Sequence, residues 1–70
     1  MSRWQYLTLK AIQKYIKERG ISPRITDIAK ELNNSDQRVR YNVLKLQEYG
    51  FVKYENKRIK LLKDFNITYE

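Results

Sequence analysis

Residues 25–52 read ITDIAKELNNSDQRVRYNVLKLQEYGFV, and the pattern in this stretch decides the fold. Its first part places apolar residues at the spacing of one helix face, which predicts a short helix over residues 26–32. That face consists of Ile25, Ile28, Ala29 and Leu32. Thr26 is expected to cap the start of this helix. Asn33 and Asn34 then form a turn, because asparagine tolerates left-handed backbone angles.

A longer helix is predicted over residues 36–49, with Ser35 as its N-cap. Its core face follows the i, i+4, i+7 pattern and spans about 60° at 100° per residue. The members of that face are Val39, Val43 and Leu46. The opposite face and its flanks are polar and mostly basic, with Gln37, Arg38, Arg40, Tyr41, Lys45 and Glu48. Leu44 falls nearer the polar face than the core, so we expect it to contact the first helix or a second subunit.

Two short segments after this helix alternate polar and apolar residues, which predicts a β-hairpin over residues 51–62. A two-residue turn at Asn56 and Lys57 fixes the pairing. The expected pairs are Glu55 with Arg58, Tyr54 with Ile59, and Val52 with Leu61. In this register the apolar residues share one face, while Lys53 and Lys60 share the other.

The segment before the quoted stretch predicts a first helix over residues 3–19, ended by Gly20 in a left-handed conformation. Its apolar residues are Trp4, Leu7, Leu9, Ala11, Ile12, Tyr15 and Ile16. They span about 200°, more than the stripe of a helix with one buried side. We assign Trp4 and Tyr15 to the core. The wide stripe means that the rest of the domain wraps this helix, or that part of it meets a second subunit.

Residues 63–70 alternate again and are interpreted as a third strand, a dimer arm or a frayed tail. Together with the wide stripe of the first helix and the position of Leu44, this alternation favours a symmetric homodimer. The competing interpretation is a monomer in which the tail covers the first helix.

The chain of 70 residues corresponds to a single small domain, residues 1–70. It has no cysteine and no histidine, which excludes disulfides and makes a metal site unexpected. It also has no Gly-rich phosphate loop and no nucleophile paired with a base, so we expect no enzymatic activity, no cofactor and no small-molecule ligand. No apolar run approaches the roughly 18 residues of a membrane span. A cytoplasmic protein without a membrane partner is therefore expected.

The charge balance favours nucleic acid as the partner. Fifteen Lys and Arg residues stand against eight Asp and Glu residues, for a net charge of +7. The excess is concentrated between residues 37 and 60. This part of the chain holds Arg38, Arg40, Lys45, Lys53, Lys57, Arg58 and Lys60, but only Glu48 and Glu55.

The order helix, short helix, turn, helix and hairpin resembles the winged helix-turn-helix domain of bacterial and archaeal transcription regulators. The runs GISPR (20–24), DIAKEL (27–32), GFV (50–52) and IKLL (59–62), with Leu46, look like the N-terminal DNA-binding domains of LexA-type repressors. The run SDQRVR (35–40), followed by Val43, Leu46 and Gly50, resembles the reading helix of GntR-type regulators. The abundance of Lys, Ile, Tyr and Asn resembles small regulators of archaea and their viruses or plasmids.

The resemblance implies that residues 35–40 face bases and phosphates, and that the hairpin tip lies on the DNA backbone or in the minor groove. Arginine suits base reading, because its planar fork can bond guanine at two points, whereas lysine acts as a point charge on phosphate. Gln37 can pair with adenine at two points, with capping and phosphate contact as the alternatives. Free N–H groups at the start of the short helix suit phosphate. The residues expected to contact double-stranded DNA are Arg24, Thr26, Ser35, Gln37, Arg38, Arg40, Tyr41, Lys45, Lys57 and Arg58.

The sequence thus predicts a mainly α-helical domain with a small antiparallel β-hairpin, a three-helix winged helix-turn-helix. The expected function is sequence-specific DNA binding by a transcription regulator that represses by occupying promoter DNA. Two alternatives stay open: an architectural or replication-associated binder indifferent to sequence, and a winged-helix module that docks proteins. For individual side chains the alternative is an ordinary solvated helix face or turn.

Overall fold

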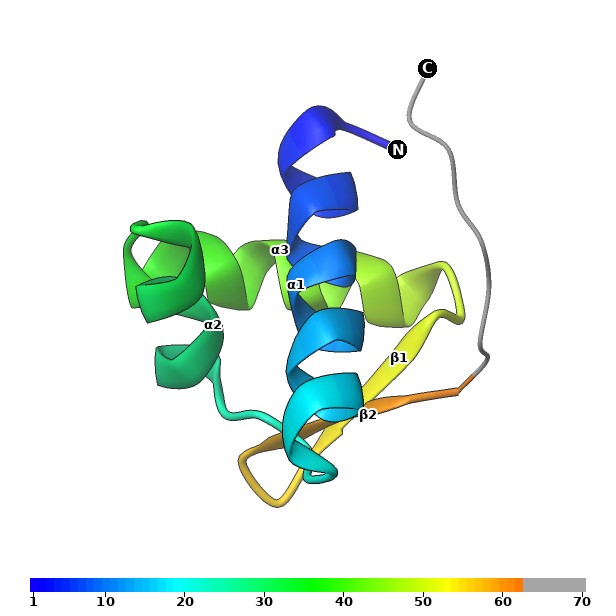
Figure 1. Ribbon diagram of the computed structural model, residues 1–70. Helices are drawn as coiled ribbons and strands as arrows, with labels where there is room; N and C mark the ends of the chain where they lie inside the picture. Colours follow the sequence, from blue (N-terminus) through cyan, green and yellow to red (C-terminus); the bar gives the residue numbers. More distant parts are fainter. Residues whose placement is uncertain (63–70) are drawn as a thin grey trace.

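Three helices are followed by one antiparallel pair of strands in the computed structural model, which describes residues 1–62 (Figure 1). The elements are α1 (Arg3–Arg19), α2 (Ile25–Leu32), α3 (Asp36–Glu48), β1 (Val52–Glu55) and β2 (Arg58–Leu61). This confirms the mainly helical fold with a small hairpin, and the arrangement is compatible with a winged helix. The third strand or dimer arm considered for residues 63–70 lies outside the described residues.

The first helix has strong signals at both ends. Ser2 and Gln5 form a reciprocal capping box: the Gln5 N–H donates to Ser2 Oγ at 3.3 Å, and the Ser2 N–H donates to Gln5 Oε1 at 3.0 Å. Gly20 ends the helix with φ 70°, as predicted, and its N–H donates to the carbonyl of Ile16 at 2.7 Å. The predicted limits of α1 are confirmed.

The second helix begins one residue earlier than predicted, and Thr26 is not its cap. Ile25 is already helical, and the N-cap position belongs to Arg24. Asp27, three residues further along, stabilises this end of the helix, because its Oδ2 accepts the N–H of Arg24 at 2.9 Å. The apolar Ile25 is buried, so packing draws it into the helix in spite of the favourable capping chemistry of Thr26.

The Asp27 cap leads to a pH prediction. The Arg24 N–H, which donates to this carboxylate, lowers the pKa of Asp27 from its usual 3.8. A carboxyl with a lowered pKa in the folded state stabilises that state above its unfolded pKa, and the contribution is lost as the pH falls through the folded value. Asp27→Ala should therefore cost about 1 kcal/mol of unfolding free energy near neutral pH. Urea unfolding should show the two proteins converging in strong acid. A difference that persists unchanged at every pH would contradict this role of Asp27.

The third helix starts where predicted, because Ser35 Oγ accepts the N–H of Arg38 at 3.2 Å. It ends at Glu48, one residue earlier than predicted, and Tyr49 is the C-cap. Gly50 then adopts φ 85°, which allows the Phe51 N–H to donate to the carbonyl of Leu46 at 3.0 Å.

The hairpin has the predicted register. Its pairs are Val52 with Leu61, Lys53 with Lys60, Tyr54 with Ile59, and Glu55 with Arg58. Asn56 and Lys57 occupy the turn with φ 52° and 62°, the two left-handed angles of a type I′ turn. Lys53 and Lys60 are exposed on one face, while Val52 and Ile59 are buried on the other. The face assignment is therefore confirmed.

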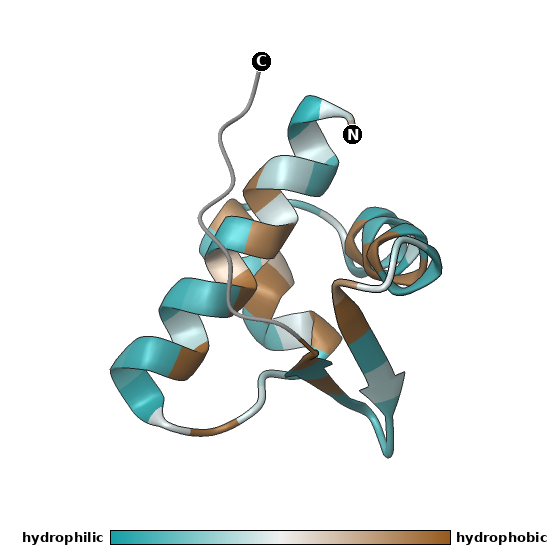
Figure 2. Ribbon diagram, turned by 90° about the vertical axis from the view of Figure 1, so that its right-hand side faces the viewer, coloured by the Kyte–Doolittle hydropathy of each residue, from teal (hydrophilic) through white to brown (hydrophobic). Residues whose placement is uncertain are grey.

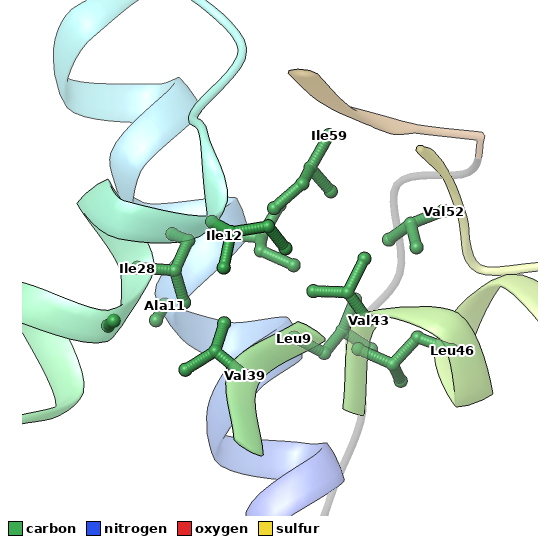
Figure 3. Packing of buried hydrophobic residues seen from close by; sticks show 11 residues of the cluster. Leu9, Ala11, Ile12, Ile28, Val39, Val43, Leu46, Val52 and Ile59 are labelled. Carbon is green, nitrogen blue, oxygen red and sulfur yellow. The ribbon is translucent and has the colours of Figure 1, made fainter. Parts of the chain in front are cut away.

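The core joins all five elements around the middle of α1 (Figure 3). Its fully buried apolar residues are Leu9, Ile12, Ile28, Val39, Val43, Leu46, Val52 and Ile59. The core face predicted for α3 is confirmed. Because α1 contacts α2, α3 and β2 within one chain, the wide apolar stripe of α1 does not require a second subunit.

Two apolar residues do not lie where the sequence placed them. Trp4 is 45% exposed and is not a core residue, because its side chain lines a surface groove beside the first half of α3. Leu44 is 44% exposed, so it is not buried against the first helix. Tyr15 does pack against the core as expected, and Arg19 lies over its ring, 4.6 Å from the centroid.

Two hydrogen bonds donated by backbone N–H groups of the hairpin attach it to the rest of the domain. The N–H of Ile59 donates to the carbonyl of Pro23 at 2.8 Å, which ties β2 to the connector between α1 and α2. The N–H of Tyr54 donates to Gln47 Oε1 at 2.7 Å, which ties β1 to α3. The hairpin is therefore held in a fixed orientation relative to α3.

Candidate nucleic-acid interface

The outward face of α3 is the surface on which most of the predicted contact residues meet. Figure 2 shows α3 nearly end-on: α1 lies on one side, and among residues 1–62 no other element covers the opposite side. Gln37, Arg38, Arg40 and Tyr41 are all exposed, and Lys45 is half-buried. The structure thus brings five predicted residues of α3 to one surface, beside its N-cap Ser35.

Arg38 and Arg40 lie on opposite flanks of this face. Neither forms an ion pair with any acidic side chain of residues 1–62. Their guanidinium groups therefore remain available to an outside anion or hydrogen-bond acceptor. Such a pair of flanking cations suits a helix that lies between two negatively charged strands.

Lys45 is less available than the sequence implied. Its Nζ lies 3.3 Å from Glu48 Oε2, and the hydrogen bond that the ammonium donates to this carboxylate raises the pKa of Lys45. The same ammonium lies over the Tyr41 ring, 5.7 Å from the centroid. Because Glu48 offsets its charge, Lys45 adds less to the positive field of α3 than either arginine.

An open groove of about 440 Å³ lies beside the first half of α3. It is lined by Ser2, Trp4, Asn34, Gln37, Arg38, Tyr41 and Asn42. The exposed rings of Trp4 and Tyr41 provide apolar surface there, and the amides and the guanidinium provide hydrogen-bonding groups. Trp4, Asn34 and Asn42 were not predicted as part of this site. The spacing of Trp4 pointed to the core, and nothing in the sequence separates it from a core residue.

The start of α2 is a weaker anion site than expected. Asp27 occupies it: its carboxylate accepts the Arg24 N–H and lies 3.4 Å from Arg24 Nε. This negative charge competes with phosphate for the same N–H groups. Thr26 remains exposed and can still donate its hydroxyl.

The four cations of the hairpin differ in their contacts: two lysines share one carboxylate, Arg58 bonds a carbonyl oxygen, and Lys57 forms no ion pair within residues 1–62. Glu55 Oε2 lies 3.4 Å from Lys53 Nζ, and Glu55 Oε1 lies 2.9 Å from Lys60 Nζ. The hydrogen bond from Lys60 and the charges of both lysines lower the pKa of Glu55. Arg58 donates from Nη1 to the carbonyl of Ser22 at 3.0 Å. Lys57 at the tip forms no ion pair within residues 1–62. Arg58 therefore has a structural role that the sequence did not reveal, while Lys57 is the cation of the hairpin best placed for DNA.

The two sets of predicted residues thus lie on different parts of the surface. The α3 set is contiguous, whereas Arg24, Thr26, Lys57 and Arg58 belong to the start of α2 and the hairpin turn. Figure 1 shows these last two regions at the end of the molecule away from the start of α1. Figure 2 shows the hairpin turn below α3.

No family model matches the chain, and no curated protein matches it significantly.

Within the part of the chain that the structure describes, no group of acidic side chains is arranged to hold a metal ion. The same residues contain no helix long and apolar enough to cross a membrane.

Proposed function

We propose that this protein is a winged helix-turn-helix domain that binds double-stranded DNA sequence-specifically, with α3 in the major groove. The single observation that supports this most is the uncovered face of α3, on which Arg38 and Arg40 are exposed and form no ion pair within residues 1–62. The hairpin, as the wing, lies beside that face and offers Lys57 to the phosphate backbone.

The roles follow from side-chain chemistry. An arginine on either flank can bond guanine O6 and N7 together, and Gln37 can bond adenine N6 and N7 in the same two-point way. Ser35 and Thr26 offer hydroxyl groups to phosphate oxygens, which would fix the register of the protein on DNA. A bound domain would exclude other proteins from a promoter, which is the simplest mechanism for a repressor.

One observation favours the rival function of a binder indifferent to sequence. Other exposed cations without an ion pair in residues 1–62 lie outside α3 and the hairpin, including Lys10, Lys17 and Lys30. Cations spread over several faces attract DNA in many orientations without reading it. The specific and the indifferent binder differ in one measurable quantity, the gap in affinity between the best duplex and random DNA.

Selection from random duplexes with the purified protein, at two salt concentrations, tests the proposal. We expect one motif to be enriched and to bind at least about a thousandfold more tightly than random DNA. Enrichment should survive the higher salt, because base contacts are less sensitive to salt than phosphate contacts. Binding without an enriched motif would support the rival function, and no binding at all would contradict both.

The wing contact makes a separate prediction. Lys57→Ala should weaken binding to all duplexes alike and reduce the slope of log K against log salt by about one unit. Lys57 is the right residue to change, because Arg58 also supports the fold through Ser22. Lys17→Ala, which removes the same charge from α1, is the matched control and should leave the slope nearly unchanged. Equal slopes for the parent and Lys57→Ala would show that the hairpin tip does not touch DNA.

A further inference from the structure

Leu44 is an exposed aliphatic residue in the middle of a polar surface. It continues the outward row of α3 that Gln37 and Tyr41 begin, at the spacing i, i+4, i+7. Its neighbours on that surface, at three or four residues' distance, are Arg40, Tyr41, Gln47 and Glu48, and all of them are exposed. With 44% of its surface accessible, Leu44 contributes little to the core. Leu44 is therefore accessible to a partner molecule.

The dimensions of the row match the major groove. From Gln37 to Leu44 the helix rises about 10 Å, at roughly 1.5 Å per residue. The major groove is about 12 Å wide, so Gln37, Tyr41 and Leu44 fit between the two phosphate backbones together. Glu48 lies about 16 Å from Gln37 on the same scale, so it would reach a phosphate backbone if the helix axis crossed the groove steeply. There the Lys45 ammonium, 3.3 Å away, offsets the negative charge of Glu48 that would otherwise repel phosphate.

We propose that Leu44 contacts the C5-methyl group of a thymine in the major groove and so determines specificity for that base. This inference rests on the proposed function, since it assumes that α3 enters the groove. The other groups by which the major groove distinguishes base pairs are hydrogen-bond donors and acceptors. Leucine can offer such groups nothing, whereas the thymine methyl is apolar and gains from burial against it.

The alternative partner of Leu44 is a second copy of the chain, but the surface around Leu44 does not suit a dimer interface. A stable protein interface buries at least about 1,000 Å² around a continuous apolar centre. Leu44 is instead one aliphatic side chain among an arginine, two amide or acidic side chains and a tyrosine. An isolated apolar group surrounded by hydrogen-bonding groups is what a helix that reads base edges presents.

Replacement of thymine by deoxyuridine tests this contact, because uracil lacks only the C5-methyl group. Starting from the best duplex of the selection, each thymine is replaced singly and the Kd is measured for the parent and for Leu44→Ala. For the parent we expect one thymine whose replacement weakens binding about three- to fivefold, the contribution of one buried methyl. Leu44→Ala should bind the original duplex at least about three- to fivefold more weakly than the parent does. The variant should also bind the thymine and uracil duplexes equally well at that position.

The matched control is Leu62→Ala, which shortens another exposed leucine, 53% accessible, just after β2. It should respond to deoxyuridine as the parent does. A parent protein indifferent to every replacement, or a Leu44→Ala variant still sensitive at the same position, would overturn the inference while leaving sequence-specific binding intact. A change of sedimentation mass in Leu44→Ala would overturn it in favour of a dimer contact. A selection without any enriched duplex would contradict the proposed function itself, and the inference with it.

Discussion

Arg40→Ala is expected to lose about 1–3 kcal/mol of affinity for the best duplex, a factor of about 5 to 150 in Kd. The loss should be confined to one base position, where the preference for guanine disappears. The reason is that Arg40 is exposed beside the buried Val39 and forms no ion pair within residues 1–62, so its guanidinium is free to bond a base at two points. Quantitative binding of the parent and the variant to every single-base change of the duplex measures both effects.

Lys10→Ala is the control for Arg40→Ala. It removes one positive charge from an exposed position of α1, on a different helix from the reading face. We expect it to weaken all duplexes slightly and equally, through the loss of net charge alone. The assignment of the reading face is wrong if Arg40→Ala binds its best duplex as tightly as the parent, or if both variants lose the same amount on every sequence.

Ile59→Ala is expected to destabilise the fold by about 2–5 kcal/mol. Ile59 is fully buried and is the residue through which β2 closes the core over α1 (Figure 3). Its replacement leaves a cavity between the hairpin and the helices. In a domain of this size the loss corresponds to a fall in Tm of roughly 10 °C or more, measured by circular dichroism.

The comparison for Ile59→Ala is Leu62→Ala, which shortens an aliphatic side chain at a position that is 53% exposed. Such surface changes usually stay within about 0.5 kcal/mol. A fall in Tm of the same size in both variants would mean that the hairpin does not close the core. A variant Ile59→Ala as stable as the parent would mean the same.

The core and the hairpin were predictable because each depends on a repeating pattern. The i, i+4, i+7 spacing of Val39, Val43 and Leu46 defines a single face, and any other helix orientation would expose all three. The hairpin register followed from the same logic, since a shift by one residue would move Val52 and Ile59 to the solvent. In such cases only one helix orientation or strand register buries the apolar residues, so it can be predicted from their spacing in the sequence.

The errors occurred where two short-range effects compete. Thr26 has good capping chemistry, but burial of Ile25 outweighs it and moves the cap to Arg24. Trp4 has the spacing of a core residue, yet it lines a surface groove beside α3, and no spacing rule shows which part of an apolar stripe a neighbouring helix covers. The capping box of Ser2 and Gln5, by contrast, follows a recognisable sequence signature and was open to prediction.

The candidate site could be predicted only in part from the sequence, because a count of basic residues does not show which of them already contact other groups of the protein. Lys45 and Arg58 look equivalent to Arg38 and Lys57 in the sequence. The structure separates them: Glu48 holds Lys45, and Arg58 donates to the carbonyl of Ser22. The Arg58 bond depends on the tertiary fold, which brings the hairpin to the α1–α2 connector. Lys45 and Glu48, by contrast, are three residues apart on α3, so that pair could have been predicted from the spacing.

The most direct test of the account is to map the DNA-contacting surface of the protein by NMR. Amide chemical shifts of the isotope-labelled protein are followed during titration with the best duplex. We predict the largest changes at residues 35–41 of the α3 region and at the hairpin turn, Asn56 and Lys57, with little change along residues 10–19 of α1. The opposite result, large changes on α1 with α3 unaffected, would contradict the central claim that the outward face of α3 enters the major groove.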